Sequence, residues 1–558
     1  MYINNRDLGF MAKFDIFKPK ERYLFMSHSN RRQFIKKAGA GVAGLGAISL
    51  GAAGLGLLPE FGRASQLWSS GAVPFFPRAT PESQGVSSPA IRAFVAAANA
   101  SGISWHSFML VRHGRVVAEG WWKPFESRWV HSLYSLSKSF TSTAIGLLVK
   151  EGRLDIQAPV ISFFPVETPA NPSGNLRKMT VRSLLTMNTG HDEDTMPKMR
   201  ASEDPWIRTY LDQPVPYEPG SHFLYNTGNT YMLGAILHQI TGLTLEQYLG
   251  PRLFLPLGIT GYDWEVSPQG LNTAGYGLRV KTEDIAKLGQ LYLQKGNWRG
   301  STILPETWVQ AATSVQTTSQ AGNGDWSQGY GYQFWRCTHD FYRGDGAYGQ
   351  FCIVMPELDA VLAVTSQSAD MQQSMNLIWD HLPGAMQAGP LPDDRAVQAA
   401  LKTELAGLAL PVVKGSVTSP LASKYHQRVW TLADNEFGAQ TLEFEFSAKA
   451  CKLTIETRDR SDTLVFGWEN WLVNADRESY IFKTGDLFPM PSHIAGTATW
   501  SDDHTLQLNT RFVEAIFGDS ITCVFEGGKL TVSFLNSVAA ADKKKLEARK
   551  GLTGERRG

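Results

Sequence analysis

The hydrophobic pattern of this chain changes near residue 410, and that change limits how the chain can fold. Before it, apolar residues recur at helical spacing between short apolar runs; after it, short segments alternate apolar and polar residues between turns. With 558 residues, the chain also exceeds what one hydrophobic core usually serves. We therefore predict an α+β domain over residues 74–386, a linker over 387–410 and an all-β domain, barrel-like or sandwich-like, over 411–540. We expect the charged tail, 541–558, to be loose.

Periodicity and turn residues predict the elements of both domains. The expected helices cover residues 89–100 with Ser88 as N-cap, the stretch from Ser135 to Gly152, and residues 181–187, 231–241, 244–248, 282–294, 373–382 and, in the linker, 391–407. The expected strands of the first domain are a hairpin at 108–111 and 116–118 and runs at 331–335, 351–355 and 360–365. Those of the second domain are 441–446, 451–457, 463–468, 497–500, 505–509, 521–525 and 530–534.

Composition excludes several classes of function. The formal net charge is +1, which gives no field that would gather nucleic acid or an acidic membrane surface. The four cysteines show no Cys-x-x-Cys spacing, so we expect no metal site of that kind. Cys337 and Cys352 lie on two strand-like runs joined by a glycine-rich turn, where either a disulfide or two buried thiols is compatible with the pattern.

An N-terminal extension, residues 1–65, has the pattern expected of an export signal. Residues 30–37 read Asn-Arg-Arg-Gln-Phe-Ile-Lys-Lys, and a glycine- and alanine-rich apolar run over 38–58 follows. This arrangement resembles a twin-arginine signal peptide, which implies a bacterial protein exported to the periplasm or the extracellular space, with Met26 as its start. The alternative is a membrane anchor, but the many glycines make the run weakly hydrophobic, so we expect no stable membrane insertion after cleavage.

A Ser-x-x-Lys sequence, Ser135-Leu136-Ser137-Lys138, stands where the predicted hairpin leads into a long helix. Three residues are about one helical turn, so Ser135 and Lys138 share a face and the amine can reach the hydroxyl. The helix N-terminus favours developing negative charge and lowers the pKa of a nearby lysine. A serine hydroxyl is a poor nucleophile until a base takes its proton, and a desolvated lysine can be that base.

The surrounding sequence resembles a known family. The run from Leu133 to Ser142, continuing to Glu151-Gly152-Arg153-Leu154-Asp155, is similar to the nucleophile helix of β-lactamase-related serine hydrolases. Segments at 80–86, 184–190 and 277–279 are also similar to stretches that occur in this order in one branch of the family, so the resemblance covers about residues 74–384. It implies a β-lactamase/transpeptidase-like fold, with an antiparallel sheet flanked by helices plus a helical subdomain. The pattern is most similar to the esterase and 6-aminohexanoate-dimer hydrolase branch of this class C β-lactamase and penicillin-binding-protein-like group.

Two further motifs carry the resemblance. They also show where this sequence lacks groups with which the family binds penicillins. Tyr225-Asn226-Thr227 resembles the second motif, which implies that Tyr225 completes the base and protonates the leaving group, although Thr227 stands where the family has Asn. Gly346-Ala347-Tyr348-Gly349-Gln350 resembles the third, which implies an oxyanion hole formed by the backbone N–H groups of Ser135 and Ala347. By the same resemblance, Thr227, Tyr348, Gly349 and Gln350 bind substrate. The Lys/His-Thr-Gly form is absent there, and the literal Lys483-Thr484-Gly485 falls in the second domain, where we interpret it as a turn.

These features favour a serine hydrolase that cleaves a small-molecule ester or amide through an acyl-enzyme on Ser135, without a cofactor. The first alternative is a true β-lactamase or D-Ala-D-Ala carboxypeptidase. The second is a non-catalytic penicillin-recognising sensor, which would have no need of Ser135, Lys138 and Tyr225 together. The acidic run 191–194 suits a solvated loop at the rim of the site better than a metal site. The sequence does not define the oligomeric state.

Overall fold

The computed structural model of the chain describes residues 76–475, 480, 482, 491–542 and 544–557. The segment predicted as an export signal and the Lys483-Thr484-Gly485 sequence therefore lie outside the described residues, and both interpretations stay predictions. No helix within those ranges is long and apolar enough to cross a membrane.

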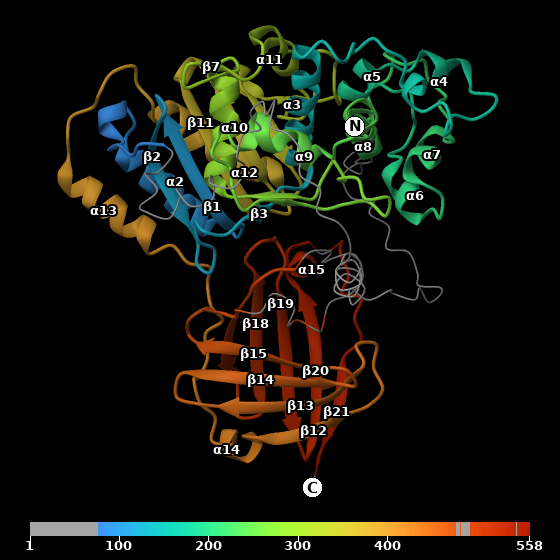
Figure 1. Cartoon of the computed structure of the whole chain (residues 1–558). Coiled ribbons are helices and arrows are strands. Elements are labelled where there is room, and N and C mark those ends of the chain that lie inside the picture. The colour runs from blue at the N-terminus through green and yellow to red at the C-terminus, as the bar shows by residue number, and fades with distance from the viewer. Residues whose placement is uncertain (1–75, 476–479, 481, 483–490, 543, 558) are drawn as a thin grey trace, which may run out of the picture. The chain divides into compact units, whose positions relative to one another are not determined.

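A six-stranded antiparallel sheet forms the centre of the first domain (Figure 1). Its order across the sheet is β2 (Arg115–Trp121), β1 (Ser104–Arg112), β11 (Ala360–Gln367), β10 (Gln350–Met355), β9 (Tyr342–Gly346) and β8 (Trp335–Arg336). The predicted hairpin is confirmed as β1 and β2, which pair antiparallel across the His113-Gly114 turn. Strand β1 pairs with β11, which lies some 250 positions later in the chain. The first and last parts of the domain therefore meet in one sheet.

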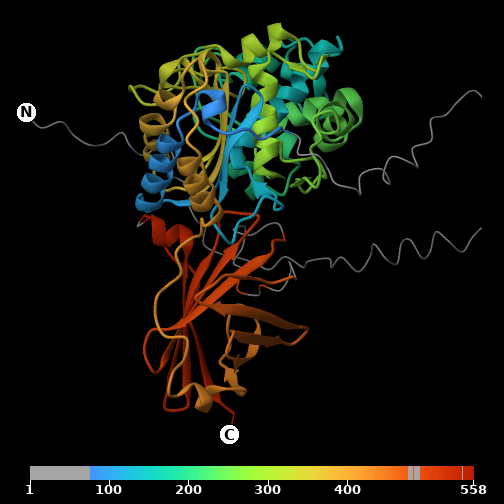
Figure 2. The same cartoon turned by 90° about the vertical axis from the view of Figure 1, so that its left-hand side faces the viewer.

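Both faces of this sheet are covered, which explains why its inner strands read as continuous apolar runs. On β10, Phe351 and Ile353 face one hydrophobic cluster while Cys352 and Val354 face the other. Helix α10 (Thr282–Leu293) packs on the second of these faces, and α2 (Ser88–Ala100) and α12 (Met371–His381) pack on the first. In the linker, α13 (Arg395–Ala406) packs on α2 (Figure 2), where the Arg92 guanidinium pairs with Glu404 at 2.6 Å.

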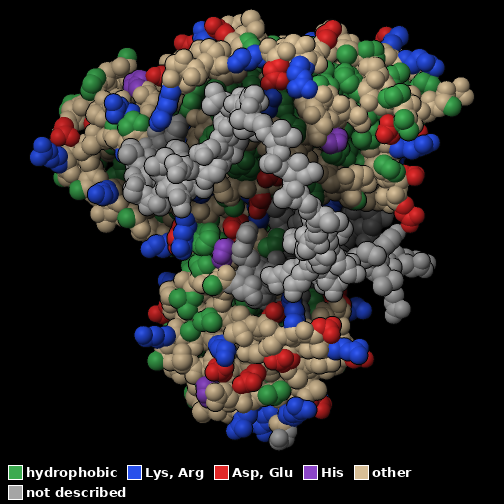
Figure 3. Space-filling view, in the orientation of Figure 1, with side chains coloured by type: hydrophobic (Ala, Val, Ile, Leu, Met, Phe, Trp, Pro, Cys, Tyr) green, Lys and Arg blue, Asp and Glu red, His purple; other side chains and the backbone are tan. Residues whose placement is uncertain are grey.

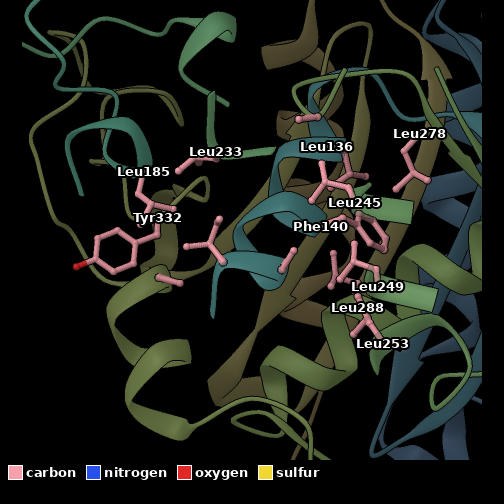
Figure 4. Close-up of a cluster of buried hydrophobic side chains, with 14 of the residues drawn as sticks. Leu136, Phe140, Leu185, Leu233, Leu245, Leu249, Leu253, Leu278, Leu288 and Tyr332 are labelled. Atoms are coloured by element: carbon pink, nitrogen blue, oxygen red, sulfur yellow. The ribbon is translucent and has the colours of Figure 1, made fainter. Parts of the chain in front are cut away.

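A helical subdomain surrounds α3 (Ser137–Lys150), the helix that follows the Ser-x-x-Lys sequence. Figure 4 shows Leu136 and Phe140 packed among leucines from several segments of the chain. The serines and threonines of α3 are buried too, and hydroxyls among them bond to carbonyls of the surrounding loops: Ser139 to Gln333 at 2.9 Å and Thr141 to Ala274 at 2.9 Å. The helix is therefore fixed on all sides, which holds its N-terminal turn in place.

The remaining elements of the first domain are short, apart from α8, which packs against α3. The helices are α4 (Gly174–Lys178), α5 (Val181–Leu185), α6 (Met196–Ala201), α7 (Trp206–Leu211), α8 (Thr227–Thr241), α9 (Leu245–Leu249) and α11 (Glu306–Thr313). The strands are β3 (His131–Ser132), β4 (Asp263–Trp264) and β5 (Leu278–Val280) in one small sheet and β6 (Asn297–Trp298) and β7 (Ser301–Thr302) in another.

The second domain is all-β, as predicted. Its sheet has the order β15-β14-β13-β12-β21-β20-β19-β18-β17-β16, and a short parallel pairing of β15 with β17 brings its two ends together. Figure 1 shows β13, β14 and β15 crossing β18, β19 and β20 steeply, as in a barrel. Inside it, the rings of Trp430 and Phe444 pack on Phe525 with centroids 5.4 and 5.3 Å away.

The bounds of these elements are as follows. The strands are β12 (Arg428–Leu432), β13 (Ala439–Phe446), β14 (Ala450–Thr457), β15 (Ser461–Trp468), β16 (Leu472–Val473), β17 (Ile494–Trp500), β18 (Thr505–Phe512), β19 (Asp519–Glu526), β20 (Lys529–Asn536) and β21 (Leu552–Arg556). Two short helices, α14 (Ala422–Tyr425) and α15 (Ser537–Ala541), accompany them.

The structure corrects three of the sequence predictions and decides a fourth point that the sequence left open. The tail is not loose, because β21 pairs with β12 and β20 inside the sheet. The N-cap of α2 is Ser87 rather than Ser88, since its side chain accepts the Ala90 N–H. Of the strand expected at 331–335, only the last residue is in β8; the aromatic residues there pack in a loop instead. All four cysteines are buried free thiols, so no Cys337–Cys352 disulfide forms.

Figure 3 shows acidic and basic side chains mixed over the face in view. This mixture is in line with the formal net charge of +1.

Candidate active site

The structure brings Ser135 and Lys138 into direct contact. Ser135 lies in a 3-10 turn, η2 (Tyr134–Leu136), that continues into the first turn of α3, where Lys138 lies. The Lys138 amine Nζ is 3.0 Å from Ser135 Oγ and donates to the carbonyl oxygen of Gly275 at 2.9 Å. The one-turn spacing predicted from the sequence therefore places a base next to the hydroxyl.

The amine of Lys138 is in an environment that favours its neutral form. Its side chain is buried, with 1% of its surface exposed, and burial lowers its pKa from 10.5 to about 7, while the carboxylates of Asp194 and Asp345 act in the opposite direction. Among the described residues, no carboxylate lies within ion-pair distance of Nζ. A large fraction of the amine is consequently free to accept a proton at neutral pH.

Tyr225 completes the group. It stands two residues before α8, its hydroxyl shares a hydrogen bond with Ser135, and the Lys138 amine lies 5.0 Å from its ring centroid. The indole of Trp335 stacks on the ring at 5.5 Å, and Tyr330 packs edge-on at 6.1 Å. Burial raises the pKa of Tyr225 above its ordinary value, so the phenol stays protonated at neutral pH and is available as a proton donor.

Strand β9 runs alongside η2 and leads into Ala347. The approach is so close that a Cβ on Gly346 would lie 2.1 Å from the Leu133 carbonyl oxygen, and one on Gly344 2.3 Å from a methyl of Leu136. Position 346 therefore requires glycine, because a backbone oxygen blocks a Cβ there, whereas a Cβ at position 344 would displace the Leu136 side chain. Ala347, half-buried at the end of the strand, is consequently brought to the side of the nucleophile, where the resemblance expects its backbone N–H.

Two tyrosines frame this point with strained backbones. Tyr134 precedes Ser135 with φ of 49°, and Tyr348 follows Ala347 with φ of 65°. Their rings meet edge to face with centroids 5.6 Å apart. Left-handed backbone at bulky residues costs free energy and persists only where the surroundings enforce it, so both candidate oxyanion donors lie next to enforced turns.

The other predicted substrate-binding residues divide into two pairs. Thr227 and Tyr348 are half-buried at the site, with Thr227 Oγ1 3.5 Å from Lys138 Nζ. Gln350, in contrast, is fully buried, and its amide donates to the carbonyls of Ala347 at 3.0 Å and Ser366 at 2.7 Å. Gly349, with φ of 87°, leaves no room for a Cβ beside Ser366. Gln350 and Gly349 thus brace the turn that presents Ala347, and their contact with substrate stays a prediction.

Sequence reasoning missed a buried ion pair behind the site. Asp345 on β9 accepts a hydrogen bond from Arg343 Nε at 2.8 Å, and both side chains are buried. The Arg343 guanidinium lies 4.5 Å from the centroid of the Trp326 ring and donates to the sulfur of Cys337 at 3.2 Å. The strand that leads into Ala347 therefore carries a carboxylate whose charge acts on Lys138. The one feature of the sequence that could have predicted this ion pair is the position of Asp345 between Gly344 and Gly346.

The residues of the acidic run 191–194 differ in burial and in the groups that they contact. Asp194 is half-buried and accepts the backbone N–H groups of Thr227 at 2.9 Å and Met196 at 3.1 Å. Asp192 and Glu193 are exposed, and Glu193 pairs with Lys198. No group of three His, Cys, Asp or Glu side chains arranged to hold a metal ion occurs among the residues that the structure describes.

Comparison with known proteins places the chain in a family. It matches the Beta-lactamase family over residues 89–382, more than half of its length, and therefore belongs to that family. It is 24% identical over 285 residues to a 6-aminohexanoate-dimer hydrolase of Paenarthrobacter ureafaciens, covering 47% of this chain and 73% of the relative. It is 24% identical over 235 residues to a β-lactamase of Escherichia coli (strain K12), covering 38% of this chain and 59% of that protein.

Among solved structures, a D-stereospecific amidohydrolase from Streptomyces sp. matches with a TM-score of 0.43 and 18% identity, covering 53% of this chain and 99% of that one. The family match makes this chain an enzyme of the serine β-lactamase superfamily, and its β-lactamase/transpeptidase-like domain is followed by an all-β domain.

Proposed function

We propose that this protein hydrolyses an ester or a linear amide through an acyl-enzyme on Ser135. The observation that carries the proposal is the buried Lys138 amine, 3.0 Å from the Ser135 hydroxyl, with a pKa lowered to about 7 and no ion-pair partner among the described residues. Burying an amine without a counter-ion is costly, and such an environment is typical of a lysine that works as a general base.

In the acylation step, neutral Lys138 takes the proton of Ser135 Oγ as the oxygen forms a bond to the substrate carbonyl carbon. The negative charge of the resulting tetrahedral intermediate is held by the backbone N–H groups of Ser135 and Ala347. Tyr225 gives its proton to the leaving oxygen or nitrogen, the bond to the leaving group breaks, and the proton on Lys138 passes to Tyr225. Water then attacks the acyl carbon and loses a proton to the same pair. The bond between the acyl carbon and Ser135 Oγ breaks, the pair returns the proton to Ser135 Oγ, and the acid product leaves.

The charges around the site favour an ester or amide without a carboxylate at the position that β-lactams fill. The strand beside the nucleophile carries Gly344-Asp345-Gly346 directly before Ala347, where the family's Lys/His-Thr-Gly form would supply a cation. Asp194 and Asp345 add negative charge, and the Arg343 cation is buried against Trp326. The 6-aminohexanoate-dimer hydrolase that this chain resembles is, by its name, a hydrolase of a non-β-lactam substrate.

Parallel assays with p-nitrophenyl acetate and nitrocefin test this proposal. We expect steady turnover of the ester by the wild-type enzyme, turnover of nitrocefin at least tenfold lower in kcat/KM, and loss of both in Ser135→Ala. Faster turnover of nitrocefin than of the ester would favour a β-lactamase. Binding without turnover of either compound would favour a penicillin-recognising sensor.

A further inference from the structure

The hydroxyl of Thr227 lies between Lys138 and Asp194. The Lys138 amine is 3.5 Å from Thr227 Oγ1. On the other side, the Asp194 carboxylate accepts the backbone N–H of Thr227 at 2.9 Å and is close enough to the Thr227 hydroxyl to interact with it. Ser135, Lys138, Thr227 and Asp194 thus lie in one chain of polar contacts.

The direction of the hydrogen bond between Thr227 and Lys138 matters for the chemistry. An asparagine, which the family has at this position, presents either an amide oxygen that only accepts or an amide nitrogen that only donates, whereas a threonine hydroxyl can rotate to do either. A hydroxyl that donated to neutral Lys138 would occupy the one lone pair that must receive the proton of Ser135. A carboxylate can only accept, so a Thr227 hydroxyl that turns its hydrogen to Asp194 leaves only its oxygen for Lys138, and that oxygen can only accept from the amine.

We propose that Asp194 is a positioning residue that, together with Thr227, does the work of the family's asparagine. Asp194 fixes the hydroxyl hydrogen of Thr227, so that the amine of Lys138 keeps its lone pair directed to Ser135. This inference rests on the proposed function, since it assigns Lys138 the role of base.

The surroundings hold Asp194 in the required place. The neighbouring Thr195 donates from its N–H at 3.2 Å and from its hydroxyl at 2.8 Å to the side-chain oxygen of Asn226. The loop that carries Asp194 is therefore clamped to the residue before Thr227. Burial raises the pKa of Asp194, while hydrogen bonds from Met196 and Thr227 and the charge of Lys138 act in the opposite direction.

Among the described residues, few charged or titratable groups face Lys138. They are Asp194, Asp345 with its partner Arg343, and the phenol of Tyr225. The effect of Asp194 on the pKa of Lys138 and on catalysis can therefore be measured apart from the effects of the other groups. Asp192, exposed in the same loop, offers a matched control because Asp192→Asn makes the same change of charge two residues away.

The experiment compares Asp194→Asn, Thr227→Asn, the double variant and Asp192→Asn in hydrolysis of p-nitrophenyl acetate across pH. We expect Asp194→Asn to lower kcat about 10- to 100-fold with KM within about twofold, the range seen for supporting residues of catalytic groups. The acidic limb of its pH profile should move to lower pH, because a carboxylate no longer raises the pKa of Lys138. In the Thr227→Asn background, which restores an acceptor of fixed direction, Asp194→Asn should cost less than about threefold.

Two results would overturn the inference: an unchanged kcat and pH profile in Asp194→Asn, or the same loss in the Thr227→Asn background as in the wild type. An NMR titration of the Lys138 side chain in Ser135→Ala protein supplies a readout that needs no turnover. A lower lysine pKa after Asp194→Asn, with none after Asp192→Asn, supports the coupling, and equal values contradict it. If the wild-type protein gave no Ser135-dependent hydrolysis, the proposed function would fail, and the titration would still decide on Asp194.

Discussion

Each domain buries a cluster of charged side chains, and the two clusters are built differently. In the β domain, the Arg549 guanidinium bonds to Asp519 at 2.6 Å, to Glu547 at 2.7 Å and to the Phe482 carbonyl at 3.2 Å. Burial would lower the pKa of Arg549, but these bonds raise it. Burial would likewise raise the pKa of Glu547, but its bonds from Arg549 lower it to about 2.

In the first domain, Lys138 has no such partner. Its amine contacts only neutral oxygens, and the nearby carboxylates of Asp194 and Asp345 are occupied by Thr227, Met196 and Arg343. Burial therefore dominates, and the pKa of Lys138 is lowered to about 7, whereas the pKa of Arg549 is raised. The cluster around Arg549 is paired and stabilises the fold. The cluster around Lys138 is incompletely paired, so it keeps a proton acceptor available.

Removing the unpaired amine should give the largest effect on activity. We expect Lys138→Met to lower kcat/KM at least about a thousandfold, the scale seen when members of a catalytic unit are removed. The free energy of unfolding should not decrease, because an apolar chain of similar length replaces a buried amine without a counter-ion. Ester hydrolysis and urea denaturation measure both quantities. Lys402→Met, an exposed change of the same type, should leave both unaltered, and kcat/KM within tenfold of wild type in Lys138→Met would refute the role of base.

The reverse result is expected for the paired cluster. Arg549→Met leaves Asp519 and Glu547 without their partner, and breaking a buried ion pair costs about 3 to 5 kcal/mol. Urea denaturation followed by tryptophan fluorescence should show this loss, while kcat/KM per molecule of folded enzyme stays within about twofold. An Arg549→Met protein as stable as the wild type would remove the distinction between the two clusters.

The pH dependence should carry the signature of Lys138. Since the amine must be neutral to act as a base, kcat/KM should rise with pH through about 7. Between about 7 and the unfolded-state value of 10.5, the unfolded chain binds the proton and the folded chain does not, so the free energy of unfolding should rise with pH. The slope from this residue is at most about 1.4 kcal/mol per pH unit. Lys138→Met should lack this component, and an identical slope in the variant would contradict the lowered pKa.

Treatment with a thiol reductant should have the smallest effect of these tests, and it should leave the stability of both domains nearly unchanged. Cys337, Cys352, Cys451 and Cys523 are buried free thiols, and burial raises the pKa of each. Dithiothreitol should therefore change the melting temperature by less than about 1 °C, because no disulfide is available to lose. Calorimetry with and without dithiothreitol measures this change. A melting temperature that drops by several degrees would show that a disulfide had been present.

Much of the fold could be predicted because its elements have strong local patterns. The β1–β2 hairpin, α3 and the alternating strands of the second domain follow from periodicity and turn residues. Strand β9 could not be predicted, because its glycines and charges suit the close approach to η2 and the buried Arg343–Asp345 pair rather than strand propensity. Strand β21 was missed for a similar reason: a charged sequence at a chain end became ordered only by pairing on both sides.

At the site, the sequence predicted the residues whose roles depend on local spacing. Ser135 and Lys138 are one helical turn apart, so their contact could be predicted from the helix alone. The surroundings of Asp194 and Gln350 could not be predicted, because they depend on which distant segments the fold brings together. Asp194 meets Thr227 across 33 positions of sequence, and Gln350 turns inward to Ser366 across 16.

Covalent trapping of the nucleophile tests the central claim most directly. The full-length protein is treated with a fluorophosphonate at pH 8, and the adduct is located by peptide mass spectrometry. We predict one adduct, on Ser135, which is absent from Ser135→Ala and forms at least about a hundredfold more slowly in Lys138→Met. An adduct on another residue, or labelling of Ser135 at an unchanged rate without Lys138, would contradict the assignment of Ser135 and Lys138 as nucleophile and base.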